Sequence, residues 1–392
     1  MISLLNEAAA LEPYLIALRR DLHRHPELGR HEFQTAQRVE RELRALGLQT
    51  RRIAGTGVIG FLRGKSDGPC IALRADMDAL PIQERCDSDF SSECPGVMHA
   101  CGHDMHTAAL IGAAGLLVRH RAELHGSVRF LFQPDEEGDG GAQRMIDEGC
   151  MEDVSAVFGA HIAPELSVGT VGVRFGKAYA ASNPFDIVLR GRSAHGAEPH
   201  LGADAIVAAS ALVGAIQTLV SREVSPLDPA VISIGSFHAG TARNIIADEA
   251  HISGIIRCFG AEMRAHLTRR LTALAEGIAA AHGVRADVRI QWGYSGIIND
   301  AAMTALIRDS AASLLGQGAV TVEQEPSLTT EDFGAFLEHA PGSFWHIGVG
   351  RSDGPCVPLH NPHFNPDESA LRFAAALHAQ VAMDALSHLS KS

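Results

Sequence analysis

The stretch at residues 98–106, MHACGHDMH, places a thiol, three imidazoles and a carboxylate within nine positions. Side chains two positions apart in an extended chain point to the same side, so Cys101 and His103 can face one ion. Thiolate and neutral imidazole are ligands that zinc and similar divalent ions prefer. Without further ligands the pair is only a buried cysteine beside histidines, and a catalytic metal site needs at least three ligands. The stretch therefore predicts partners elsewhere in the chain.

Length and composition indicate a soluble globular protein with two domains. The chain has 392 residues, 46% of them hydrophobic and 20% charged, and single cores rarely grow to that size. The formal net charge of -13 argues against nucleic acid or an anionic membrane surface as a partner. The seven cysteines are scattered, and neither a basic leader nor an unbroken apolar run of membrane-spanning length is recognised. These features predict a cytoplasmic protein.

Carboxylates follow two predicted strands at the point where each strand ends. The buried strand at residues 70–75 leads into Asp76 and Asp78, which share one side of the chain because they are two positions apart. A second predicted strand is followed by Glu136 and Glu137. Adjacent carboxylates project differently, so one can bind a metal ion while the other activates water. A solvated turn would explain either pair if it stood alone.

Two histidines, His161 and His360, are further candidates for the site that these carboxylates indicate. His161 ends a predicted buried strand, where a histidine on its own is more typical of a satisfied core residue. His360 lies between Pro358 and Pro362, which pre-set the backbone of a rigid loop. Because open α/β sheets bind ligands beyond the carboxyl ends of their strands, this recurrence favours one shared site.

A helix is predicted at residues 107–124. The pair formed by Cys101 and His103 is therefore expected on the loop that enters this helix, with Asp104 as a candidate cap. His99 and His106 are left to supporting or structural roles.

The pattern GTGVIG at residues 55–60 matches the dinucleotide-binding fingerprint. The fingerprint requires a helix after the glycines, whereas residues 58–63 continue as a strand. This context argues against a dinucleotide-dependent oxidoreductase.

From about Ala180 the order of predicted elements becomes βαββαβ, which is the split ferredoxin-like unit of roughly a hundred residues. The predicted organisation is a catalytic domain at residues 1–180, a lid domain at 181–292, and the second part of the catalytic domain at 293–392. Polar clusters in two loops of the lid are equally compatible with ordinary turns and with function.

Four motifs occur in order along the chain: ALRADMDALP at residues 72–81, MHACGHD at 98–104, QPDEEG at 133–138 and LHNP at 359–362. Together they resemble the amidohydrolase branch of the aminoacylase and glutamate-carboxypeptidase family of di-metal peptidases. This branch includes hippurate hydrolases, N-acyl-amino-acid amidohydrolases and the auxin-conjugate hydrolases of plants. The resemblance runs from the HRHPE segment at residues 23–27 to Asn365 and covers nearly the whole chain.

The resemblance implies an α/β catalytic domain, with a mixed sheet flanked by helices, and an inserted ferredoxin-like α+β lid domain that often dimerises. It also implies two divalent metal ions. Cys101 would bridge them, His103 and His161 would complete one site, and Glu137 and His360 the other. Zinc is the first expectation and manganese, cobalt or nickel are the alternatives, because a bridging thiolate shifts metal preference.

The resemblance also assigns catalytic residues. Glu136 matches the general base, and His195 in the lid resembles the histidine that polarises the scissile carbonyl. Asp76 stands where the broader family has a ligand histidine and is grouped with the catalytic residues. Asn244 resembles the residue near the substrate carboxylate, and Arg257 is a looser candidate for substrate binding beside His195.

The expected activity is metal-dependent hydrolysis of the amide bond in N-acyl amino acids, with Glu136 as the base. A dipeptidase or carboxypeptidase with the same centre is the alternative. A non-catalytic metal-binding protein is less compatible with two adjacent glutamates, since binding alone needs only one. The expected partners are a small-molecule substrate and a second copy of the chain, a dimer formed through the lid.

Overall fold

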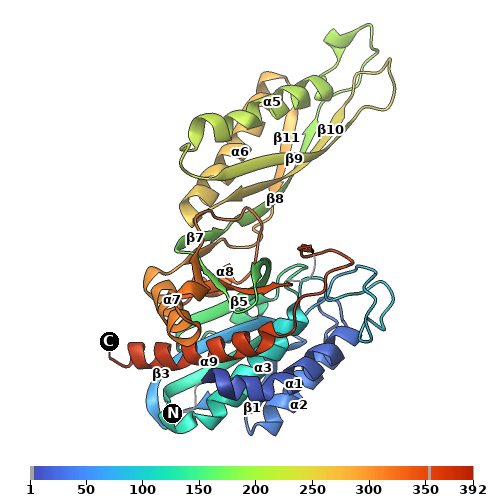
Figure 1. Cartoon of the computed structure of the whole chain (residues 1–392). Coiled ribbons are helices and arrows are strands. Elements are labelled where there is room, and N and C mark those ends of the chain that lie inside the picture. The colour runs from blue at the N-terminus through green and yellow to red at the C-terminus, as the bar shows by residue number, and fades with distance from the viewer. Residues whose placement is uncertain (1–3, 352–354, 392) are drawn as a thin grey trace. The chain divides into compact units, whose positions relative to one another are not determined.

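The computed structural model describes residues 4–351 and 355–391. These residues divide into two compact units (Figure 1). Unit 1 contains the chain up to Ala178, Asn299–Glu325, and the chain from Asp332 onward, and unit 2 contains Tyr179–Ile298 and Pro326–Glu331. Strands β7 (Gly176–Tyr179) and β12 (Ile297–Asn299) carry the chain from one unit into the other.

The core of unit 1 is a mixed sheet. Its strands are β1 (Gln49–Ile53), β2 (Gly57–Arg63), β3 (Ser66–Asp76), β4 (His125–Gln133), β5 (Val154–Ser167), β6 (Val171–Val173), β13 (Val320–Val322) and β14 (Gly342–Gly350). Among the described residues the order is β1-β2-β4-β3-β5-β14-β6-β13. The neighbours β4, β3, β5 and β14 pair in parallel, so the carboxyl ends of these strands lie at one edge of the sheet.

Helices flank this sheet (Figure 1). They are α1 (Leu4–Arg24), α2 (Phe33–Ala45), α3 (His103–Arg119), α4 (Ala142–Asp147), α7 (Ala301–Leu315), α8 (Gly334–Leu337) and α9 (Ala370–Leu389). Helices α1, α3 and α9 pack against one another, and α3 and α9 also contact β3. The prediction of a helix starting at residue 107 was wrong at its amino end, because Gly102 adopts a left-handed φ of 80° and lets α3 begin at His103.

Unit 2, whose residues are all described, has the expected ferredoxin-like order of elements. These are β8 (Ala181–Arg190), α5 (Ala205–Glu223), β9 (Ala230–Ala239), β10 (Glu249–Cys258), α6 (Ala261–Ala281) and β11 (Arg285–Ile290). The sheet has the order β11-β8-β10-β9, and each neighbouring pair is antiparallel. Helices α5 and α6 pack together against it, with Leu212 and Leu271 fully buried. The predicted α/β fold with a ferredoxin-like insertion is thereby confirmed.

One described helix, α5, is long and apolar enough to meet the length and hydropathy of a membrane span, although no apolar run of that length was expected from the sequence. Its apolar side is accounted for by the core of unit 2, because Ala208, Leu212, Ile216 and Leu219 are fully buried there.

Candidate metal centre

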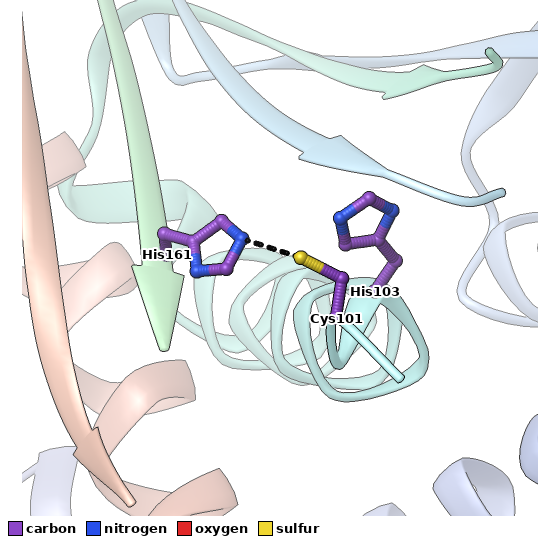
Figure 2. Close-up of side chains that lie close together, drawn as sticks. All are labelled: Cys101, His103 and His161. Atoms are coloured by element: carbon purple, nitrogen blue, oxygen red, sulfur yellow. Dashed lines mark hydrogen bonds between the residues drawn. The ribbon is translucent and has the colours of Figure 1, made fainter. Parts of the chain in front are cut away.

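The five predicted metal ligands converge within unit 1. Cys101 lies just before α3 and His103 is the first residue of that helix, while His161 lies on β5. Glu137 follows the end of β4, and His360 lies in the loop before α9. Figure 2 shows the Cys101 sulfur pointing toward the ring of His161, with the side chain of His103 on the other side of Cys101. Helix start, strand and loop thus bring together residues that span most of the sequence.

The ligand atoms form two overlapping groups. Those of Cys101, His103 and His161 all lie within 4.8 Å of one another, and so do those of Cys101, Glu137 and His360. The Cys101 sulfur is 3.4 Å from Nε2 of His161 and 3.3 Å from Nε2 of His360. Cys101 belongs to both groups, which is the position that a thiolate shared by two ions would take.

Hydrogen bonds leave the ligand nitrogens of two histidines facing the centre. Nδ1 of His103 donates to Asp78 at 3.2 Å, and Nδ1 of His161 donates to the carbonyl of Ile162 at 2.8 Å. Metal-binding histidines are oriented in this way, with the second nitrogen bonded to a carboxylate or carbonyl. Nε2 of His103 is buried and has no hydrogen-bond partner among the described residues. This orphaned atom fits a metal ligand.

The pKa values of two candidate ligands, His103 and Cys101, are raised by their surroundings. Burial lowers the pKa of His103, but the neighbouring carboxylates of Asp76, Asp78 and Glu137 outweigh burial and raise it to about 10. Burial also raises the pKa of the Cys101 thiol well above its ordinary value, and the glutamates beside it add to this. A divalent cation would replace the protons that these groups otherwise hold, as metal binding to thiols and imidazoles does.

A buried polar layer supports the ligands. Asp76 accepts hydrogen bonds from Nδ1 of His106 and from Arg74, each at 2.6 Å. Nε2 of His106 accepts the backbone N–H of Ile162 at 3.0 Å, so the imidazole is neutral with its proton on Nδ1. Burial lowers the pKa of His106 and favours this neutral form. Asp76 therefore lies among polar partners, 3.7 Å from Nε2 of His103. The catalytic role of Asp76 stays a prediction.

Asp78 and Arg74 were given no role in the site from the sequence. Asp78 accepts the backbone N–H of Glu137 at 3.0 Å in addition to its bond with His103, although the sequence pointed to it only as the carboxylate two residues after Asp76. Arg74 also donates to Asp332 at 3.1 Å. The 258 positions between these two residues leave no local pattern from which to predict the pair.

Glu136 lies beside the ligands. A carboxylate oxygen of Glu136 is within 4.8 Å of ligand atoms of both His103 and Glu137, and the side chain is buried at 7% exposure. A carboxylate in this position can exchange a proton with a group held between it and the ligands.

The loop of His360 is held in a strained conformation. His360 has a left-handed φ of 61°, which residues other than glycine adopt at a cost. Its backbone N–H donates to the carbonyl of Ala100 at 2.8 Å, so the loop is pinned to the stretch that carries Cys101. Such strain is typical of functional sites whose surroundings fix the backbone.

Of the three predicted substrate-binding residues in unit 2, the structure brings His195 and Asn244 together and places Arg257 elsewhere. Gly196, next to His195, donates its N–H to the carbonyl of Asn244 at 2.8 Å, and both side chains are exposed. Nδ1 of His195 accepts the N–H of Ala197 at 3.1 Å, so a neutral ring carries its proton on Nε2. Arg257 lies eight positions after the start of β10 at Glu249, about 26 Å along the strand.

The chain matches the model of the peptidase family M20/M25/M40 over residues 72–384. It is 43% identical over 365 residues to an N-acetyl-L-cysteine deacetylase of Bacillus subtilis, covering 93% of this chain and 86% of the relative. It is 37% identical over 385 residues to IAA-amino acid hydrolase ILR1-like 4 of Arabidopsis thaliana, covering 97% and 87%. Thermostable carboxypeptidase 1 of Saccharolobus solfataricus is 37% identical over 384 residues, covering 96% and 97%.

Solved structures share the fold over nearly the whole chain. A Bacillus subtilis protein described as a dinuclear metal-binding peptidase of the M20 family superposes with a TM-score of 0.85 at 38% identity, covering 97% of this chain and 99% of the other. A putative aminohydrolase from methicillin-resistant Staphylococcus aureus superposes with a TM-score of 0.93 at 32% identity, covering 98% and 99%.

Proposed function

Because the chain belongs to the peptidase family M20/M25/M40, we propose that it hydrolyses the amide bond of N-acyl amino acids at a centre of two divalent metal ions. The observation that carries this proposal is the pair of ligand groups that share Cys101, with Glu136 beside them. Relatives named as an N-acetyl-L-cysteine deacetylase and as an IAA-amino acid hydrolase support the substrate class.

The proposed ligands are those that the geometry groups. Cys101 is shared, His103 and His161 hold one ion, and Glu137 and His360 hold the other. Bound ions supply a water molecule of lowered pKa and a Lewis acid for the carbonyl oxygen. Zinc is the proposed metal because thiolate and imidazole dominate the ligands, and manganese, cobalt and nickel are the alternatives.

Glu136 is the proposed general base. Its carboxylate takes the proton of the attacking water and then delivers that proton to the nitrogen of the departing amine, so one group serves both halves of the reaction. The role requires a carboxylate that does not bind metal, which is why Glu137, and not Glu136, is the proposed ligand.

His195, Asn244 and Arg257 are the proposed substrate-binding residues of unit 2. The proton on Nε2 of His195 suits donation to the carbonyl oxygen as negative charge develops there. Asn244 and Arg257 are assigned to the substrate carboxylate. Arg257 is half-buried, and its Nη1 has no hydrogen-bond partner among the described residues, which suits an anion. Asp76 is proposed to take part in catalysis, through its hydrogen bond to His106 and its position 3.7 Å from Nε2 of His103.

A homodimer formed through unit 2 is also proposed. Strand β9 is an edge of the sheet, and Phe237 on it is 40% exposed. Ile206 and Val207 on α5 are exposed as well. An open edge and apolar side chains on one unit favour pairing with a second copy. We propose the cytoplasm as the location, from the free cysteines.

Carboxypeptidase activity is the second candidate. The carboxypeptidase of Saccharolobus solfataricus aligns with 96% of this chain, much as the deacetylase and the IAA-amino acid hydrolase do. The test is elemental analysis of the purified protein together with a panel of acylated amino acids and free dipeptides. Two ions per chain and turnover of the acylated amino acids are expected. Preference for dipeptides or for C-terminal residues would select the second candidate, and metal binding without turnover of any substrate would overturn both.

A further inference from the structure

The turn that precedes the two glutamates has an unusual backbone. Asp135 has a left-handed φ of 56°, a conformation that costs energy for any residue with a Cβ. Such a residue persists only where the surrounding structure fixes it. Because Glu136 and Glu137 follow directly, the backbone at Asp135 sets the direction in which both carboxylates leave the chain.

The side chain of Glu32 holds this turn. Glu32 is fully buried, and its carboxylate accepts the backbone N–H of Asp135 at 2.8 Å and the hydroxyl of Thr56 at 2.5 Å. A buried carboxylate is costly unless such bonds satisfy it, and here a residue 103 positions away contributes the backbone donor.

Glu32 does not have the local role that its position suggests. It is the N-cap residue of α2, yet its side chain makes no capping hydrogen bond. Glu27 instead accepts the backbone N–H groups of Gln34 and Thr35 at 2.9–3.1 Å. Glu27 thus satisfies the amino end of the helix, and the carboxylate of Glu32 is directed to Asp135.

The side chain of Asp135 fits a space that two glycines leave open. A Cβ on Gly29 or on Gly138 would lie 2.2 Å from Oδ1 of Asp135. The other oxygen accepts hydrogen bonds from Arg30, at 3.0 Å, and from Arg144. The segment before α2 therefore holds both the backbone and the side chain of Asp135.

We propose that Glu32 is a positioning residue for the hydrolysis: by holding the backbone N–H of Asp135, it fixes the left-handed turn that aims Glu136 and Glu137. Its kinetic consequence rests on the proposed hydrolysis, whereas its effect on metal content rests only on the proposed ligand Glu137. A displacement of about 1 Å at a reacting group can cost about a hundredfold in rate. Loss of the Glu32 carboxylate therefore affects the base and one metal ligand together.

The first experiment compares Glu32→Ala with Glu27→Ala. Glu27 lies in the same segment, and the described hydrogen bonds of its carboxylate all come from Gln34 and Thr35 of α2. Metal-free protein is reloaded with zinc, and bound metal, kcat and KM are measured. Glu32→Ala is expected to lose about a hundredfold in kcat with little change in KM, and to retain one ion in place of two. Glu27→Ala is expected to unfold at a lower temperature with two ions and unchanged kcat. Glu32→Gln, which keeps an acceptor oxygen, is expected to recover most of the loss.

A second pair keeps the inference testable if Glu32→Ala does not fold. Asp135→Asn and Asp135→Val both remove the charge, but asparagine tolerates the left-handed conformation and a β-branched residue does not. Asp135→Val is expected to have at least tenfold lower kcat than Asp135→Asn and a weaker second ion.

Two results would overturn the role of Glu32: two ions and kcat within about threefold of the wild type in folded Glu32→Ala, or equal losses in Glu27→Ala. Equal behaviour of the two Asp135 variants would overturn the role of the turn. If the wild type hydrolyses no acylated amino acid, the proposed function fails, while the metal content of the Glu32 variants still tests the inference.

Discussion

Asp78 accepts a hydrogen bond from Nδ1 of His103 at 3.2 Å, across the start of α3. The other oxygen of Asp78 accepts the backbone N–H of Glu137 at 3.0 Å. One buried carboxylate therefore orients a residue from each of the two ligand groups. A side chain outside both groups can in this way orient residues of both.

Replacement of Asp78 by alanine is expected to weaken zinc binding about 10- to 100-fold, the usual effect of removing a group that orients a ligand. Competition with a chelator measures the affinity. Asp87→Ala, at an exposed position, is the control and is expected to leave the affinity unchanged. Unchanged affinity in Asp78→Ala would contradict the orienting role.

Cys101→Ala is expected to lose both ions, because Cys101 belongs to both ligand groups. His161→Ala is the matched comparison, since His161 belongs to one of these two groups, and it is expected to retain one ion. Elemental analysis after reloading gives the two stoichiometries. Loss of a single ion from Cys101→Ala would contradict the shared thiolate.

The candidate ligands could be named from the sequence because each follows or lies in a recognisable local pattern. Parallel strands place their ends at one edge, which explains the position of Glu137 after β4. The prediction that His161 ends its strand was wrong, because β5 continues to Ser167, yet His161 still lies beside Cys101. The ferredoxin-like unit was likewise readable from its order of elements. The start of α3 was not predicted correctly, because the left-handed Gly102 allows the helix to begin at His103.

The contacts behind the ligands could not be predicted. Arg74 meets Asp332, and Glu32 meets Asp135, only after the chain has folded. Neither pair has a sequence spacing that indicates contact, because the packing of distant segments decides which buried charge finds which partner. Sequence patterns therefore predict which residues carry the chemistry, and the structure is needed to show what holds them.

Glu136→Gln is expected to lower kcat by about 10²–10⁴-fold, the contribution of a positioned acid–base group. The amide keeps the size of the side chain but cannot accept the proton of water. Metal content is expected to stay at the wild-type level, since Glu136 is not a proposed ligand. Steady-state kinetics with an acylated amino acid and elemental analysis of the same preparation measure both. Retained turnover would exclude Glu136 as the base.

His195→Ala is expected to lower kcat about 10²–10³-fold, the usual effect of removing one donor to a developing oxyanion. Metal content is expected to remain unchanged. His251→Ala, an exposed histidine on the same unit with a 51% exposed side chain, is the control. A change in KM alone would indicate that His195 binds the substrate without stabilising the transition state.

The stability of the metal-free protein is expected to fall between pH 6.5 and pH 5, in part because of His378. Burial lowers the pKa of His378 to about 3, and nearby His106 adds to this, whereas the unfolded chain titrates near 6.5. Between these values the unfolded state binds a proton that the native state does not, so the free energy of unfolding decreases as the pH falls. The decrease is about 1.4 kcal/mol per pH unit for this one group. His378→Leu cannot take up that proton, so urea unfolding at pH 6.5 and pH 5 should show a loss about 2 kcal/mol smaller than in the wild type. Equal losses would mean that His378 is not held neutral by the fold.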